Sequence, residues 1–63
     1  MRAEDMTEEQ FAAVQEFRHW ALALVGRPTD AGVRYALEMA AAEVQLLGLD
    51  PSKITPEGYD DAR

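Results

Sequence analysis

The stretch GRPTD, residues 26–30, separates two long segments with a helical pattern and decides the fold. Gly26 can adopt the left-handed backbone conformation that often ends a helix, and the ring of Pro28 prevents the helix from continuing. Thr29 or Asp30 can cap a second helix, because a side-chain oxygen there can accept a hydrogen bond from its first free amides. A link of about four residues is typical of antiparallel helices. The stretch therefore predicts a helical hairpin.

Before this turn, local signals predict a helix over about residues 8–25. The hydroxyl of Thr7 can accept a hydrogen bond from the backbone amide of Gln10, and the Gln10 side chain can reach back to the Thr7 amide. This reciprocal arrangement is a capping box. Met6 and Phe11 have the spacing of a hydrophobic staple across the same helix start. The agreement between these signals indicates where the first helix begins.

After the turn, the helical pattern resumes over about residues 30–47. Gly48 repeats the stop signal seen before the turn. Leu49 has the spacing to fold back on Val44, as in the Schellman motif that ends many helices. We therefore expect the second helix to end at this glycine.

Residues 48–63 form an acidic tail that we expect to be irregular. After Gly48 the tail holds two prolines, one glycine and four acidic residues, a composition that interrupts regular structure. Ile54 and Tyr59 are its large apolar groups and are expected to pin it to the helices. The sequence predicts one all-α domain over residues 1–63, an antiparallel two-helix hairpin with a short irregular C-terminal tail.

The second helix is expected to have apolar rows on two nearly opposite sides. One row, with residues spaced four and three apart, consists of Val33, Leu37, Ala40, Val44 and Leu47. The other row has the same spacing and consists of Tyr35, Met39, Ala42, Leu46 and Leu49. The rows lie about 160° apart at 100° per residue. A helix that is apolar on two sides should be buried on two sides, and the first helix can cover only one of them.

Three covers for the second row remain open: a second copy of the chain, a different protein, or the tail folded back. A chain this short builds a thin core, and it has no cysteine for disulfides or thiolate metal sites. Self-association is therefore favoured, most simply as a homodimer that completes a four-helix bundle, although a higher oligomer also satisfies the pattern. The predicted protein interface consists of Trp20, Tyr35, Met39, Leu46 and Leu49.

One pair of residues is a candidate metal site. Glu16 and His19 have the Glu-x-x-His spacing used by di-iron helical bundles, and Glu38 or Glu43 could add a carboxylate. Two residues at a fixed spacing often occur by chance, and His19 falls on the polar side, so a solvated surface pair is the simpler interpretation. The chain has no second histidine, and its only serine is Ser52 in the tail. We expect no catalytic residues, no cofactor and no enzyme activity.

The charge and the apolar runs limit the partners. The net charge is −6, from 12 acidic and 6 basic residues, which disfavours binding to nucleic acid. The longest apolar stretch, residues 20–25, is far shorter than the roughly 20 residues of a membrane span. The acidic N-terminus does not resemble a signal peptide. We therefore expect a cytoplasmic protein without a membrane partner.

These observations favour a small acidic protein-interaction module that oligomerises and has no catalytic activity. The first alternative is an acidic inhibitor or antitoxin-like protein that binds a basic surface of a target protein, which the net charge of −6 suggests. The second alternative is a metal-binding helical bundle that uses Glu16 and His19.

Overall fold

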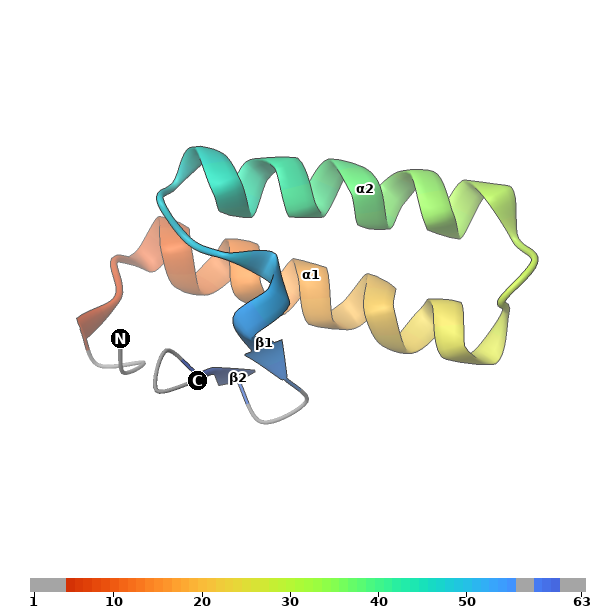
Figure 1. Cartoon of the computed structure of the whole chain (residues 1–63), viewed down its shortest axis with the longest axis horizontal. Coiled ribbons are helices and arrows are strands. Elements are labelled where there is room, and N and C mark those ends of the chain that lie inside the picture. Colours follow the sequence, from red (N-terminus) through yellow and green to blue (C-terminus); the bar gives the residue numbers. More distant parts are fainter. Residues whose placement is uncertain (1–4, 56–57, 61–63) are drawn as a thin grey trace.

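The computed structural model of the chain describes residues 5–55 and 58–60. Two helices fill most of this length and lie side by side in opposite directions (Figure 1). They are α1, Glu8–Gly26, and α2, Ala31–Leu46. The bounds of both helices agree with the predicted ranges to within one residue, so the predicted antiparallel hairpin is confirmed.

Helix α1 begins with the predicted capping box. The backbone amide of Gln10 donates to Thr7 Oγ1, and the backbone amide of Thr7 donates to Gln10 Oε1, both at 3.1 Å. The remaining polar atom of the Gln10 side chain, Nε2, donates to the backbone carbonyl of Leu47 at 3.0 Å. Because Leu47 directly follows α2, one side chain connects the start of α1 to the end of α2.

The end of α1 differs from the prediction. Gly26 is the last residue of the helix and does not have the positive φ expected of a left-handed stop. The helix is instead capped by Arg27, whose backbone amide donates to the carbonyl of Ala23 at 2.9 Å. The ring of Pro28 suffices to stop the helix, because proline has no amide to continue the hydrogen-bond ladder.

Both ends of α2 have side-chain or backbone caps. The carboxylate of Asp30, rather than the hydroxyl of Thr29, accepts hydrogen bonds from the backbone amides two and three residues further on, at 2.9 and 3.2 Å. At the other end, Gly48 has a φ of 84°, and the amide of Leu49 donates to the carbonyl of Val44 at 3.0 Å. This bond is the defining contact of a Schellman motif, so the predicted stop at Gly48 is confirmed.

The tail contains two short strands that the sequence did not predict, preceded by a single helical turn that Asp50 and Pro51 favour. It forms a 3-10 turn, η2 (Pro51–Lys53), followed by the short strands β1 (Ile54–Thr55) and β2 (Gly58–Tyr59). The strands pair antiparallel, with Ile54 opposite Tyr59. The prediction of an all-α chain with an irregular tail is wrong in this part, because the fold is mostly α with one small β-hairpin.

Tertiary contacts explain why the tail is regular. The carboxylate of Asp50 caps η2 by accepting from the amide and hydroxyl of Ser52, at 2.9 and 2.8 Å. The Tyr59 hydroxyl accepts from the backbone amide of Asp50 at 3.1 Å. Ile54 and Tyr59 are half-buried against the core, as predicted. The strands are therefore held by contacts with the helices as well as by their own pairing.

The main core lies at the open end of the hairpin, away from the turn. Its buried members are Ala13 and Val14 of α1, Val44 of α2 and Leu49 at the start of the tail. Half-buried residues from all parts of the chain pack around it: Met6, Phe17, Leu47, Ile54 and Tyr59. The core is made of small side chains and is thin.

Candidate protein-interaction surface

The second apolar row of α2 lies on the surface of the hairpin. The exposed fractions of Tyr35, Met39 and Leu46 are 65, 56 and 87%. Ala42 is exposed between them. These four residues face away from Val33, Ala40 and Val44, which are the buried residues of the same helix. We call Tyr35, Met39, Ala42 and Leu46 the outer row.

Leu49 does not belong to this surface, which corrects its assignment to the predicted interface. Its exposed fraction is 5%, and it packs in the core with Ala13, Val14 and Val44. The helical spacing that placed Leu49 in the row ends before it, because the positive φ of Gly48 turns the chain back across the end of α2. The Schellman signal in the sequence already pointed to this position.

The described part of the tail does not cover the outer row. Strands β1 and β2 contact α1, and η2 contacts α2 near its end (Figure 1). Ile54 and Tyr59 are occupied by the core. Residues 51–55 and 58–60 therefore leave Tyr35, Met39 and Leu46 open, and the row faces solvent in the single chain.

Two hollows lie beside the outer row and meet at Met39 and Glu43. The first is a groove between α1 and α2, which we call the interhelix groove, lined by Glu16, Trp20, Tyr35, Ala36, Met39, Ala40 and Glu43. The second continues toward the end of α2 and is lined by Met39, Ala42, Glu43, Leu46 and Leu47. The structure thus brings Trp20 together with Tyr35 and Met39, and Leu46 extends the same surface.

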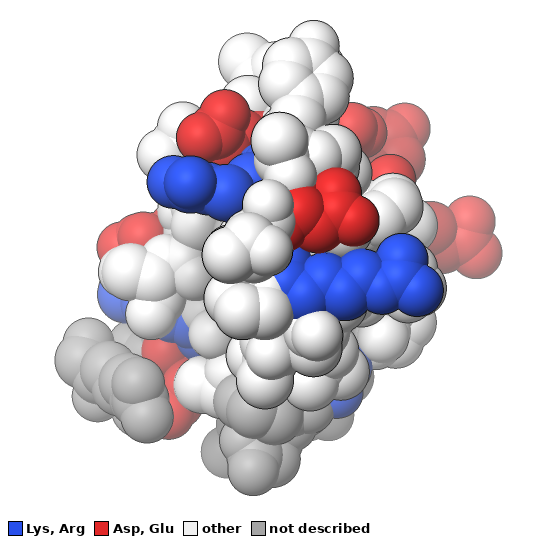
Figure 2. Space-filling view, turned by 90° about the vertical axis from the view of Figure 1, so that its right-hand side faces the viewer, with Lys and Arg blue, Asp and Glu red and all other residues white. Residues whose placement is uncertain are grey.

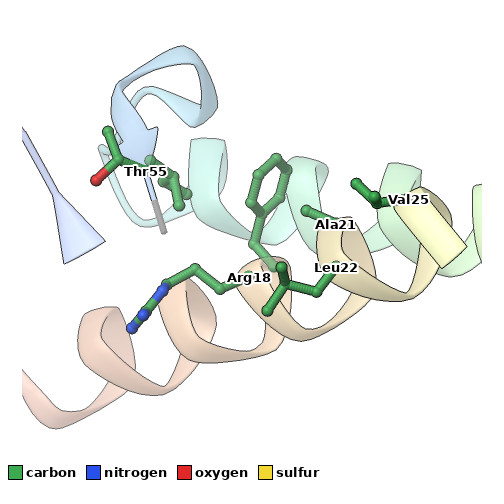
Figure 3. Close-up of a pocket in the computed structure, with 7 residues that line it drawn as sticks. Arg18, Ala21, Leu22, Val25 and Thr55 are labelled. Atoms are coloured by element: carbon green, nitrogen blue, oxygen red, sulfur yellow. The ribbon is translucent and has the colours of Figure 1, made fainter. Parts of the chain in front are cut away.

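A third hollow lies on the opposite flank of α1. We call it the α1–tail groove, and its lining residues are Phe17, Arg18, Ala21, Leu22, Val25, Ile54 and Thr55. Figure 3 shows Ala21, Leu22 and Val25 along one side of α1, with Thr55 across from them on β1. Glu16 and Val25 are nine residues apart, which places them about 180° apart around the helix. One flat interface therefore cannot include both this groove and the interhelix groove.

The sizes of the hollows indicate what they can hold. Their volumes are about 150, 290 and 310 Å³. Sites for small-molecule ligands typically occupy roughly 300 to 1,000 Å³ and enclose most of the ligand. The smallest hollow lies below this range and the other two only reach its lower end, so all three suit single side chains of a partner protein.

No protein-family model, curated protein or solved structure matches this sequence. Its function must be argued from the residues of these surfaces.

The candidate metal pair lies on the surface. Glu16 and His19 are exposed, and the His19 ring meets the Trp20 ring edge-on, with centroids 5.0 Å apart and an angle of 77°. Across residues 5–55 and 58–60, no group of three or more His, Cys, Asp or Glu side chains could hold a metal ion. In the described structure, Glu16 faces the interhelix groove rather than a set of further ligands.

Glu43, rather than Glu38, is the carboxylate of α2 that shares a hollow with Glu16. It lines the interhelix groove from α2, and Glu16 lines the same groove from α1. Neither carboxylate has a hydrogen bond or ion pair with any residue that the structure describes. Val14 and Val44 belong to one core cluster, and the packing of the two helices there fixes the register that puts these two carboxylates on one groove.

At the turn end of the hairpin, the charged side chains do not form one continuous patch. Figure 2 views the molecule from the turn end, and acidic and basic side chains are interspersed there among uncharged ones. Hydrogen bonds from the Ser52 side chain and backbone lower the pKa of Asp50 in the tail.

Neither helix in the described part of the chain is long and apolar enough to cross a membrane.

Proposed function

We propose that the chain is a protein-interaction module that self-associates through the outer row of α2. The observation that carries this proposal is the exposure of Tyr35, Met39 and Leu46 on one face of a helix whose other face builds the core. Contiguous apolar surface of this kind marks an interaction site in soluble proteins. The described tail, which could have covered the row, packs elsewhere.

The thin core supports the same conclusion. Val44 is the largest fully buried side chain among the described residues. A single core in a chain below about 70–80 residues rarely supplies more than roughly 3–5 kcal/mol of stability. Burial of the outer row in a dimer would add apolar contacts where the single chain has few.

A two-fold axis between residues 40 and 41 gives the simplest arrangement. The two α2 helices then run antiparallel, with Tyr35 of one copy against Leu46 of the other. Met39 of one copy meets Ala42 of the other, so large and small side chains interdigitate. Since the outer row lies opposite the core, the four helices form one layer, with both α2 helices in the middle, instead of a square bundle.

Light scattering coupled to size exclusion, over a hundredfold range of concentration, tests this function. Self-association predicts a mass that is a multiple of 7.0 kDa. A folded 7.0 kDa species at all micromolar concentrations would disprove it.

A second candidate function is an acidic protein that binds a basic surface of a target. The net charge of −6 and the two carboxylates of the interhelix groove support it. This function requires binding that weakens with added salt, whereas apolar self-association of two negative chains should strengthen as salt screens their repulsion.

A further inference from the structure

The interhelix groove combines an apolar floor with a hollow of the size of a side chain. Trp20 from α1 and Met39 from α2 supply apolar surface on its two sides. Ala36 and Ala40 lie between them, and their small side chains leave a volume of about 290 Å³. The long stem of a partner's side chain could lie along this floor.

Two carboxylates line the same groove, one from each helix. Glu16 and Glu43 are both exposed, and none of the other lining residues is basic. Neither carboxylate has a polar partner among the described residues. The groove therefore presents negative charge directly beside aromatic and apolar surface.

We infer that the interhelix groove binds an arginine side chain from a basic segment of another protein. The aliphatic stem of the arginine packs along Met39, and its guanidinium group faces the Trp20 ring. The carboxylates of Glu16 and Glu43 accept its N–H groups. This inference rests on the chain being a protein-interaction module, but it does not require self-association.

Charge argues against a second copy of the chain as the occupant of this groove. In the two-fold arrangement proposed above, equal flanks of the two α2 helices lie side by side. The Glu43 flank of one copy would then meet the Glu43 flank of the other, and each copy carries a net charge of −6. The apolar contacts of the outer row must outweigh this repulsion in the proposed dimer, so a second copy covers the outer row and does not fill the groove, whereas a basic segment complements the charge of the groove.

Trp20 is the only tryptophan of the chain and reports directly on the groove. The probe is a synthetic amphipathic peptide with arginines and leucines on one face, titrated while the emission of Trp20 is followed. A matched peptide replaces each arginine by citrulline, which keeps the shape and removes the charge. We expect the arginine peptide to shift the emission and the citrulline peptide to bind several-fold more weakly.

Variants that each remove one negative charge show whether Glu16 and Glu43 bind the arginine peptide. We expect Glu16→Gln and Glu43→Gln each to weaken binding of the arginine peptide by about threefold to fivefold, the upper part of the range for an exposed ion pair. Glu38→Gln is the matched control, because it removes the same charge from α2 at a residue that does not line the groove. Its effect should stay below about twofold, since charges away from the contact are screened.

Three results would overturn the inference. The arginine peptide could leave the emission unchanged, the two peptides could bind equally well, or Glu38→Gln could weaken binding as much as Glu43→Gln. Light scattering on the same samples separates this inference from self-association. A monomer that binds the peptide disproves the dimer alone. Because Met39 belongs to both surfaces, a dimer that ignores the peptide is tested again as the Leu46→Glu variant, and a monomeric variant that still ignores the peptide disproves the arginine site alone.

Discussion

Gln10 and Leu47 are 37 positions apart in sequence and are joined by a hydrogen bond of 3.0 Å from the Gln10 side chain to the Leu47 carbonyl. The same Gln10 side chain accepts from the backbone amide of Thr7, so it completes the cap of α1 and connects the two helices at once. A residue that the sequence identifies only as a capping residue is therefore also a tertiary contact.

This double role predicts unequal costs for two substitutions. We expect Thr7→Ala to lower the free energy of unfolding by about 1 kcal/mol through the lost cap. Gln10→Ala keeps the backbone amide that donates to Thr7 but loses two side-chain hydrogen bonds, to the Thr7 amide and to the Leu47 carbonyl, so it should cost roughly 1 kcal/mol more. Chemical denaturation followed by circular dichroism measures both, with Gln45→Ala at an exposed helical position as the control. Equal costs for Thr7→Ala and Gln10→Ala would show that the bond to Leu47 contributes nothing.

The two glycines that follow apolar helical segments should respond to alanine in opposite directions. Gly48 has a φ of 84°, and an alanine there would be strained by about 1–2 kcal/mol. Gly26 is the last residue of α1 and has no positive φ, and a Cβ there would meet no atom within 4 Å. Gly26→Ala should therefore stabilise the chain by about 0.5–1 kcal/mol. Thermal unfolding measures the Tm of the two variants, and a lower Tm for Gly26→Ala would contradict the observed helix end.

A charge in the outer row should dissociate the proposed dimer. We expect Met39→Glu and Leu46→Glu to give a species of 7.0 kDa with unchanged helical content, since both side chains are exposed in the single chain. Val25→Glu is the control: Val25 is 80% exposed but belongs to the α1–tail groove. Light scattering measures the mass of each variant. Loss of the assembly in Val25→Glu alone would move the interface to that groove.

The register of the proposed dimer can be tested with single cysteines, because the natural chain has none. Ala42 lies close to the proposed two-fold axis, so Ala42→Cys should form a disulfide between copies under mild oxidation. Leu22→Cys, on the opposite flank of the hairpin, should stay reduced at the same concentration. Non-reducing electrophoresis shows the outcome, and equal cross-linking at both positions would rule out the proposed axis.

The tail should respond to acid through Asp50. Hydrogen bonds from Ser52 lower the pKa of Asp50 below its ordinary value of 3.8, so folding favours the charged carboxylate. This contribution to stability is present above pH 3.8 and is lost as the pH falls through the lowered pKa. Asp50→Ala should therefore lower the Tm at neutral pH, and the difference from the natural chain should shrink in acid. A difference that stays constant down to pH 2 would refute the role of the charge.

Local signals in the sequence predict the helices well. The capping box at Thr7, the stop at Pro28 and the Schellman glycine Gly48 each act through bonds within a few residues, so their geometry follows from spacing alone. The left-handed stop expected at Gly26 is the exception, because Pro28 ends the helix without it.

Features that depend on tertiary contacts could not be found this way. The strands β1 and β2 have two residues each, and such short strands depend on the contacts of Ile54 and Tyr59 with the core. The sequence left open whether Glu38 or Glu43 lies near Glu16, because the choice depends on the helix register, which the core packing sets. The outer row could be predicted because its residues recur at the helical spacing of four and three. Leu49 was wrongly included, because the helix ends before this residue.

The hairpin is closed covalently at the turn, residues 27–30, and non-covalently by the core at its opposite end. The core therefore holds the two helices together at their open end, and the turn only links them, with residues 27–29 exposed to solvent. Loop entropy grows only slowly with length, by about 0.6 kcal/mol for each doubling. A flexible peptide inserted between Pro28 and Thr29 should thus leave both helices and the outer row in place, which makes this turn the natural position for an affinity tag or a fluorescent reporter.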